Sequence, residues 1–352
     1  MKVLLVLITL LLFVWPGFSE LKGPLPEVMK PDNITVYENE LYVVEGSEIS
    51  IYSLKDLKLI HKFGKKGEGP GELISTPGFY NKVLVFPDYL LVEGINKLVF
   101  FSKQGKLIKE KKKSVILLLA IPLGENYVVN RYKQGDDKLV YSTIALCNPE
   151  LEEIKELYRQ KHIQQGVPPS IKLDMVMDFI YFSICDDKIF IDRSPDGFIV
   201  EVFDKQGKKL YQFQKEYEKT KVTDDQKKEI IDLFKENPDI KFQIKQLGGW
   251  EELKKMISMD FPAFYPAIQE MLLAGKKIYI QTFKVKDNKS EYVVTDLKGN
   301  IIKRVYLPRF ENTPLIAKIL GAKLHTIYND KLYYLMENAD EEEWELYVEE
   351  IK

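Results

Sequence analysis

The stretch Phe63-Gly64-Lys65-Lys66-Gly67-Glu68-Gly69-Pro70-Gly71-Glu72-Leu73 decides how the rest of the chain is interpreted. Four glycines and one proline fall within nine residues, 64–72. This composition excludes helix and strand, because glycine loses too much backbone freedom there and Pro70 has no N–H to donate. The stretch joins a strand-like run that ends at Lys62 to an apolar run that starts near Phe79. We therefore interpret it as the connection between two repeated units.

The repeated unit is a phrase of three strands, each rich in Leu, Ile, Tyr and Val, separated by a polar loop and a tight polar turn. Its copies begin near residues 40, 89, 126, 187, 276 and 330. A further apolar run precedes each copy, at 34–37, 83–86, 115–121, 175–184, 267–273 and 316–327. A repeat of about 40 to 50 residues with four strands is typical of one blade of a β-propeller. The two longest distances between successive copies, from 126 to 187 and from 187 to 276, contain insertions.

These copies predict an all-β fold, a six-bladed β-propeller. The sixth copy lacks its last strand, and we expect the segment from Leu21 to Val28 to fill that place. Closure of the ring would remove the exposed sheet edges that an open array leaves. A parallel α/β fold is disfavoured, because helices do not alternate with the strands.

The longest insertion, about 215–262, lies between blades four and five. Thr223 is placed to cap a helix that Pro238 ends, and Trp250 opens a second amphipathic helix after Gly248-Gly249. We interpret the insertion as a small helical cap over the crossing between the two blades. The alternative is a lid or a flap that binds a partner.

The N-terminus, residues 1–19, has the pattern of a secretory signal peptide. Met1-Lys2 precedes thirteen apolar or small residues (3–15), and small residues at Gly17 and Ser19 fit cleavage before Glu20. An uncleaved anchor is the alternative. We expect residues 20–352 to form one propeller domain that is secreted or periplasmic. No later apolar run is long enough to span a membrane.

Composition narrows the class of protein further. The chain has 51 basic and 53 acidic residues, a balance that argues against nucleic acid as a partner. Its 20 Tyr and 19 Phe favour sheet over helix. Cys147 and Cys185 are the only cysteines. Both sit in apolar strands, which favours buried thiols, with a disulfide between them as the alternative.

The opening stretch also resembles a known family. Gly67-Glu68-Gly69-Pro70-Gly71-Glu72, directly after Lys62-Phe63-Gly64, resembles the G-x-G-P-G-E-F crossing of bacterial six-bladed β-propeller proteins of the NHL-like superfamily. The segment 261–268, Phe-Pro-Ala-Phe-Tyr-Pro-Ala-Ile, is similar to the proline-bearing segment that leads into a late blade there. Leu73 stands where Phe is usual, Glu45 stands where Asp is usual, and the helical insertion is extra. The resemblance implies the fold more than a function, since most such propellers have no assigned activity.

A binding site is expected on the face where the loops between second and third strands meet the crossings between blades. The candidate ligand-binding residues on this face are Glu72, Arg131, Asp192, Arg193 and Tyr265. The two arginines could clamp an anionic ligand. We prefer the alternative interpretation, in which the two arginines form salt bridges with neighbouring acidic loops and need no ligand.

A metal site is the second hypothesis for this face. Related propellers include metal-dependent lactonases and lyases that hold Ca²⁺ or Zn²⁺ at the mouth of the central channel. The resemblance therefore implies Ca²⁺ as the ion that acidic loop residues could hold, and the candidates are Asp136, Asp192, Asp196 and Glu337. Acidic residues are also common in turns for local reasons. The three histidines have no metal-ligand spacing, and no nucleophile elbow is present.

The sequence thus favours an exported propeller that binds a small ligand or a protein and does not catalyse a reaction. No catalytic residue is assigned, and no cofactor beyond such an ion is expected. One alternative is a metal-dependent lactonase-like or lyase-like hydrolytic enzyme that uses the same face. A second alternative is a structural component of an envelope assembly.

Overall fold

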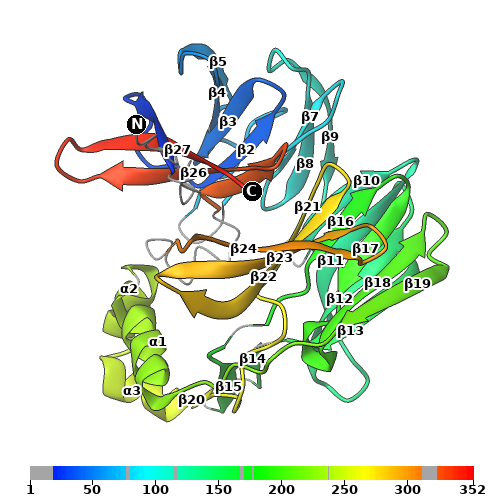
Figure 1. Cartoon of the computed structure of the whole chain (residues 1–352), viewed down its shortest axis with the longest axis vertical. Coiled ribbons are helices and arrows are strands. Elements are labelled where there is room, and N and C mark those ends of the chain that lie inside the picture. The colour runs from blue at the N-terminus through cyan, green and yellow to red at the C-terminus, as the bar shows by residue number, and fades with distance from the viewer. Residues whose placement is uncertain are drawn as a thin grey trace, which may run out of the picture.

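Antiparallel β-sheets make up most of the chain. The computed structural model describes residues 19–76, 80–114, 117–162, 164–166, 170–176, 178–236, 238–310 and 323–352. These residues contain six four-stranded sheets, one for each copy of the repeated phrase (Figure 1). In five of them four consecutive strands lie side by side in chain order.

The five sheets with consecutive strands are defined as follows. The first contains β2 (Asn33–Tyr37), β3 (Glu40–Glu45), β4 (Glu48–Ser53) and β5 (Leu59–Phe63). The second contains β6 (Lys82–Val85), β7 (Leu90–Glu93), β8 (Lys97–Phe101) and β9 (Leu107–Lys112). The third contains β10 (Leu117–Leu123), β11 (Asn126–Gln134), β12 (Val140–Cys147) and β13 (Glu153–Lys161). The fourth contains β16 (Phe182–Cys185), β17 (Lys188–Asp192), β18 (Phe198–Asp204) and β19 (Lys209–Lys215). The fifth contains β21 (Glu270–Ala274), β22 (Lys277–Lys286), β23 (Lys289–Asp296) and β24 (Ile301–Pro308).

The sixth sheet joins the two ends of the described chain. It contains β25 (His325–Tyr328), β26 (Lys331–Asn338) and β27 (Glu343–Glu350), and its outer strand is β1 (Glu20–Leu25). β1 pairs antiparallel with β27, and Leu25 lies opposite Trp344. The expectation that an N-terminal segment fills the missing place is confirmed.

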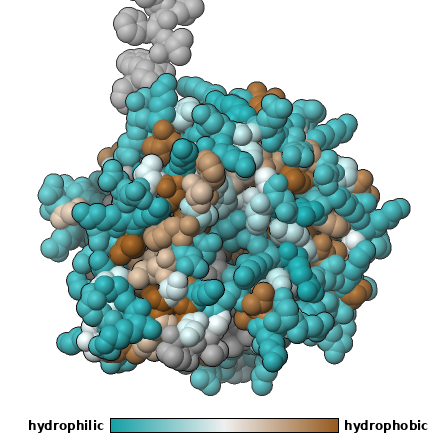
Figure 2. Space-filling model, turned by 90° about the horizontal axis from the view of Figure 1, so that it is seen from below, coloured by the Kyte–Doolittle hydropathy of each residue, from teal (hydrophilic) through white to brown (hydrophobic). Residues whose placement is uncertain are grey.

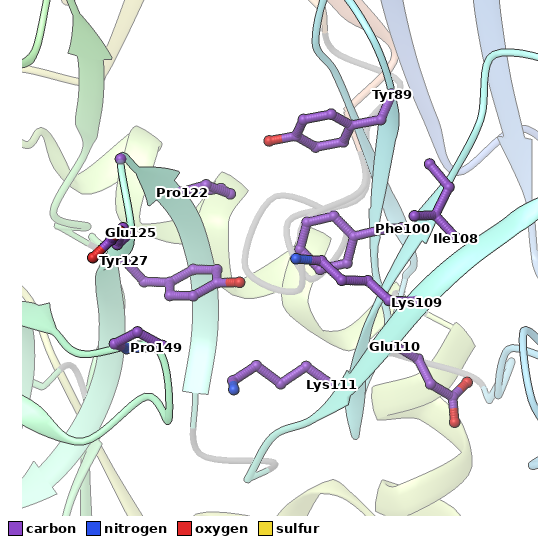
Figure 3. A pocket seen from close by; sticks show the side chains of 11 residues that line it. Tyr89, Phe100, Ile108, Lys109, Glu110, Lys111, Pro122, Glu125, Tyr127 and Pro149 are labelled. Carbon is purple, nitrogen blue, oxygen red and sulfur yellow. The ribbon is translucent and has the colours of Figure 1, made fainter.

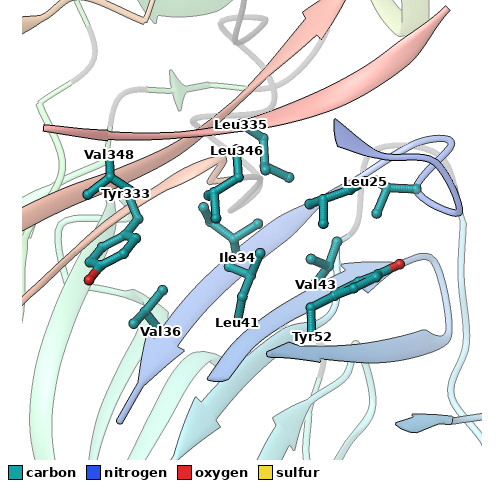
Figure 4. Close-up of a cluster of buried hydrophobic side chains, with 11 residues drawn as sticks. Leu25, Ile34, Val36, Leu41, Val43, Tyr52, Tyr333, Leu335, Leu346 and Val348 are labelled. Atoms are coloured by element: carbon teal, nitrogen blue, oxygen red, sulfur yellow. The ribbon is translucent and has the colours of Figure 1, made fainter. Parts of the chain in front are cut away.

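The core is divided among the gaps between the sheets. Six clusters of buried apolar residues each join two sheets that follow one another, and one of them joins the sixth sheet to the first. In that cluster Leu346 and Val348 of β27 pack with Ile34 and Leu41 of the first sheet (Figure 4). The sheets therefore contact one another in a closed circle. This arrangement is a β-propeller, and the predicted fold class is confirmed.

The glycine-rich stretch is the connection from the first sheet to the second. The amide of Gly67 donates to the carbonyl of Leu73 (3.0 Å), and the amide of Leu73 donates to the carbonyl of Lys65 (2.8 Å). Leu73 is fully buried in the cluster shared by the two sheets. The stretch folds back on itself so that its last residue becomes part of the core.

The insertion differs from the prediction in two respects. It contains three helices, α1 (Asp224–Glu236), α2 (Pro238–Gln246) and α3 (Trp250–Met256), where two were expected. Thr223 does cap the first of them, because its Oγ1 accepts a hydrogen bond from the amide of Gln226. A small sheet was not predicted at all. Its strands are β14 (Gln164–Gln165), β15 (Ile171–Asp174) and β20 (Ile257–Asp260), and β20 pairs parallel with β15.

Some predicted runs are shorter as strands. In the run 175–184, pairing within the fourth sheet starts only at Phe182, since the residues before it leave the small sheet. Residues 1–18, which carry most of the expected signal peptide, and 316–322 of the sixth apolar run lie outside the described residues. No helix within the described ranges is long and apolar enough to cross a membrane. Both cysteines are free thiols, Cys147 buried and Cys185 half-buried.

Candidate functional site

Charged side chains gather where the innermost strands begin. The connection from each sheet to the next leads into the start of an innermost strand, so all innermost strands start at the same face of the propeller. The second strand of each sheet ends at this face, because neighbouring strands are antiparallel. We call this place the channel mouth and define it by Asp32, Lys82, Glu93, Lys113, Asp178, Asp192, Glu270, Lys323 and His325. Its members come from every sheet or from the crossing that enters it.

The second sheet and the crossing to the third contribute a buried ion pair. Nζ of Lys113 lies 3.1 Å from Oε1 of Glu93, and both side chains are less than 5% exposed (4% and 3%). Lys113 also donates to the carbonyl of Leu117 (2.7 Å). Burial raises the pKa of the Glu93 carboxyl, although Lys113 and Lys82 oppose this shift. The other oxygen of Glu93, Oε2, has no hydrogen-bond partner among the described residues.

The fifth and sixth sheets meet through Glu270. Its carboxylate lies 2.7 Å from Nζ of Lys323 and 3.0 Å from Nε2 of His325. Burial opposes ionisation of this carboxyl, but the two basic neighbours outweigh burial and hold the pKa of Glu270 below its usual range. The residue is therefore an ionised carboxylate at neutral pH.

Lys82 is a cation without a paired carboxylate in the part of the chain that the structure describes. It opens β6 and lies opposite Glu93 in the sheet register, and its side chain is half-buried. No carboxylate oxygen of the described chain lies within 4.0 Å of Nζ of Lys82, the distance that defines an ion pair. Burial lowers the pKa of Lys82; the charge of Glu93 opposes this shift, and the charges of Lys113 and Lys323 add to it. Three lysines thus face one part of the mouth, and two glutamates pair with two of them.

The opposite part of the mouth is acidic. Asp192 is 1% exposed, and its Oδ1 accepts a hydrogen bond from the amide of Tyr181 (2.7 Å). Its Oδ2, and Oδ1 of Asp178, are buried without partners among the described residues. Burial, followed by the charge of Asp178, raises the pKa of Asp192 well above its ordinary value. Burial also raises the pKa of Asp178 to about 7.

Two predicted candidates lie away from the mouth in local networks. Oε1 and Oε2 of Glu72 accept hydrogen bonds from Nζ of Lys65 (2.6 Å) and the amide of Gly69 (3.0 Å), so this carboxylate shapes the glycine-rich stretch. Arg131 lies within β11, not in the loop that follows this strand, and pairs with Glu153 of β13. The strand continues past Arg131 because its register with β12 is unbroken to Gln134.

Arg193 is also paired with carboxylates. It follows β17 directly, and its guanidinium lies 2.6 Å from Asp196 and 2.9 Å from Glu201. These contacts are the salt bridges that the sequence favoured for both arginines. Of the predicted ligand-binding residues, the structure places only Asp192 in the channel mouth.

Tyr265 lies beside a separate cavity on the same face. Its ring stacks on Phe283 at a centroid distance of 4.5 Å. Phe283 lines a cavity of about 420 Å³ between the fourth and fifth sheets, whose other walls include Phe198, Glu291 and Arg304. Glu291 is already bonded to Thr282 and Arg304, so these two charged groups of the cavity neutralise each other.

The predicted metal ligands are not brought together. Asp136 lies in the turn after β11, Asp196 pairs with Arg193, and Glu337 lies in β26 on an exposed part of the strand. Only one group of three acidic, histidine or cysteine ligands comes within 4.8 Å in the part of the chain that the structure describes. This group is Glu341, Glu343 and Glu345 at the end of a hairpin, and it includes none of the predicted ligands.

Sequence reasoning missed most of the mouth. Lys82 and Glu270 each stand as a single charged residue at the start of an apolar inner strand, and this position is the signal that could have found them. His325 also belongs here, although the sequence marked it only as a histidine without metal-ligand spacing. The predicted face was right, but the chosen residues lie in its outer loops.

The fold and the channel mouth define a β-propeller whose channel entrance is lined by partly buried charges. No family model matches the chain, and no curated protein matches it. The NHL-like resemblance therefore stays a prediction.

Solved structures that resemble this chain are distant. A member of the DUF4221 family from Bacteroides vulgatus is 12% identical, with a TM-score of 0.47 over 95% of this chain and 97% of that one. The β-propeller domain of Swd1 from Myceliophteria thermophila is 9% identical, with a TM-score of 0.41 over 94% and 99%. BamB from Moraxella catarrhalis is 10% identical, with a TM-score of 0.31 over 90% and 71%.

Proposed function

We propose that the protein is an exported binding propeller that holds a small anionic ligand at the channel mouth. One observation carries the proposal: the half-buried Lys82 forms no ion pair within the described chain, because the neighbouring Glu93 pairs with Lys113, and Lys323 adds further positive charge nearby. Desolvating a lysine costs free energy unless an anion compensates it. A carboxylate or phosphate group at this place would complete the set of charges.

The surrounding geometry supports binding over catalysis. Glu93 and Glu270 hold the two other lysines in fixed positions, so the mouth presents a pre-organised cationic group. Pre-organised charge raises affinity because less conformational freedom is lost on binding. Asp178 and Asp192, both with raised pKa, sit across the mouth and can donate hydrogen bonds in their protonated forms.

The test compares anions at equal ionic strength. Thermal unfolding and calorimetric titration would be measured with inorganic phosphate, succinate and citrate against chloride. Phosphate stabilises many proteins without a site, so the matched variants decide. Lys82→Gln should lose the anion-specific rise in melting temperature, and Lys106→Gln, in a turn of the other face, should keep it. An equal rise in wild type and Lys82→Gln would overturn the proposal.

The metal-dependent enzyme is the second candidate. Two buried aspartate oxygens without partners in the described chain, on Asp178 and Asp192, are the observation in its favour. The described residues do not add a third ligand there, and the predicted set is dispersed, so the residues present do not fit a metal held by protein ligands alone. Metal content and melting with Ca²⁺, Zn²⁺ and chelator test it. A stoichiometric ion whose removal lowers the melting temperature would favour the enzyme.

A structural role in an envelope assembly would need a large exposed apolar surface. Seen from the side that carries the helices, the surface is mostly hydrophilic, with hydrophobic areas between (Figure 2). Among the described side chains of the insertion, Leu233 and Leu247 are exposed large apolar residues. Two exposed leucines do not by themselves make a large apolar surface, which favours the binding role over the assembly role.

A further inference from the structure

A second pocket opens at the opposite end of the strands from the channel mouth. It has a volume of about 600 Å³ and lies between the second and third sheets (Figure 3). Tyr89 precedes β7, Gly124 lies in the β10–β11 turn and Pro149 in the β12–β13 turn, so the pocket belongs to the face of the tight turns. The binding site expected from the sequence lies on the other face.

The pocket exists because one outer strand differs from the others. Five outer strands each place an apolar residue in the cluster shared with the next sheet: Leu25 of β1, Phe63 of β5, Leu157 of β13, Phe213 of β19 and Leu307 of β24. The described residues of β9 contribute none to the corresponding cluster. Its Lys109 and Lys111 lie opposite Phe100 and Leu98, which do pack in that cluster. Two lysines thus occupy the place where the other sheets close the gap with apolar side chains.

These lysines are not neutralised by the described part of the protein. Nζ of Lys109 lies 4.7 Å from the centre of the Phe100 ring, and neither Lys109 nor Lys111 has a carboxylate within 4.0 Å in the described chain. Glu110 also borders the pocket, but its carboxylate is taken up by Lys97 (3.1 Å) and the amide of Gly71 (2.9 Å) and points away from the pocket in Figure 3. Glu125 stands at the exposed rim.

The hydroxyl group of a largely buried tyrosine completes the set. Tyr127 is 8% exposed, and its hydroxyl points into the pocket without a hydrogen-bond partner among the described residues (Figure 3). Burial raises the pKa of Tyr127, so the hydroxyl is a donor at neutral pH. The hydroxyl opens into the pocket, so it can donate one hydrogen bond to an acceptor on a ligand.

We propose that this pocket binds a small anion with a flat apolar body. The acidic group lies between Lys109 and Lys111 and accepts a hydrogen bond from Tyr127, while the ring lies against Phe100, Pro122 and Pro149. Ligand pockets of this size are lined in the same way, with mostly apolar walls and a few converging polar groups. The site is independent of the channel mouth.

The test uses naphthoate as the probe and naphthamide as its uncharged counterpart, with binding measured by calorimetric titration. Naphthoate should bind at least about tenfold more tightly than naphthamide, because hydrogen bonds to a charged group are the stronger ones. The double variant Lys109→Gln, Lys111→Gln should weaken naphthoate by about tenfold or more, and Tyr127→Phe, which keeps the packing, by a few-fold.

Two matched variants distinguish this pocket from the channel mouth and from a general attraction of the anion to surface lysines. Lys112→Gln, one position along on the other side of β9, and Lys82→Gln in the channel mouth should both leave naphthoate affinity unchanged. Loss in Lys82→Gln instead would place the probe in the channel mouth and overturn the proposal. Equal affinity in wild type and the double variant, or no binding of naphthoate at about 1 mM, would also overturn it.

Discussion

Oε1 of Glu270 lies 2.7 Å from Nζ of Lys323, and this contact joins the inner strand of the fifth sheet to the chain that enters the sixth. The two residues are more than fifty positions apart in the sequence. Both carboxylate oxygens of Glu270 are used, since the other one meets His325. The pair therefore fixes the relative position of two neighbouring sheets at the channel mouth.

Replacing Glu270 by Gln should lower the free energy of unfolding at pH 7 by about 2 to 4 kcal/mol, because it leaves Lys323 partly buried without its counter-charge. Urea denaturation measures this change. Glu251→Gln is the control, since Glu251 forms an exposed pair with Lys254 in α3 and should cost less than about 0.5 kcal/mol. The pKa of Glu270 is lowered in the folded state, so its contribution is present above its ordinary value of 4.5 and is lost below it. The difference between wild type and variant should shrink in that acidic range; a constant difference would contradict the assignment.

Asp178 should give the protein a pH dependence of the opposite sign. Burial raises its pKa from 3.8 to about 7, so folding favours the protonated form. Its contribution is complete below pH 3.8 and is lost as the pH rises through 7. Wild type should therefore gain stability from pH 7 to pH 4 relative to Asp178→Asn, on the order of a few kcal/mol. Melting curves across this range measure it.

The control for this pH profile is Asp224→Asn. Lys227 lowers the pKa of this exposed carboxyl, which therefore stays ionised throughout the same range. The variant should follow the wild-type profile. If Asp178→Asn also follows the wild-type profile, the carboxyl of Asp178 does not titrate between pH 4 and pH 7. Asp178 and Asp192 would then not be the desolvated pair of carboxyls that their burial indicates.

Gly64 should be harder to replace than Gly275, another glycine with positive φ. It has φ +97°, and a Cβ there would lie 2.2 Å from the carbonyl oxygen of Ser47 and 3.2 Å from Cα of Glu48. Because backbone cannot move aside cheaply, Gly64→Ala should cost about 3 kcal/mol or more. Gly275→Ala is matched in conformation, with φ +60° and nothing within 4 Å, and should cost about 1 to 2 kcal/mol. Equal losses would show that the close approach of the glycine-rich stretch to β4 does not matter.

The strands could be predicted because each one carries its own signal. Alternating or continuous apolar runs such as Leu41–Val44 specify a strand without reference to the rest of the chain. The strand at the N-terminus can be predicted by counting, since the last copy of the phrase lacks a partner that the segment near Leu21 can supply. The small sheet gives no such signal. Its strands are short. β20 becomes a strand by pairing with β15, a segment more than eighty residues away, and the only other partner of β15 in this sheet is the two-residue β14.

The channel mouth could be predicted only as a face. The sequence shows Lys82 and Glu270 as charges before apolar runs, but it does not show that they meet Lys113 and Lys323. That meeting depends on how each sheet is turned against the next, which the core clusters determine. Loop carboxylates such as Asp136 were chosen because acidic loops are visible in sequence, and the structure satisfies them locally or exposes them.

Leu25 offers the most direct test of how the two ends of the chain close the circle. It is fully buried in the cluster that joins the sixth sheet to the first, although it stands near the N-terminus in β1 (Figure 4). Leu25→Ala should cost about 2 to 4 kcal/mol through the cavity that it leaves. Leu21→Ala in the same strand should change stability by less than about 0.5 kcal/mol, since Leu21 is 48% exposed.

The location of the lost stability is the sharper readout of Leu25→Ala. β1 covers one edge of β27, so loosening β1 exposes the amides of β27 to solvent. Hydrogen exchange in Leu25→Ala should therefore accelerate in β1 and β27 together, while β6 to β9 keep their protection. If only β1 exchanges faster, the N-terminal strand is an addition to a ring that is already stable, and the circle does not depend on it.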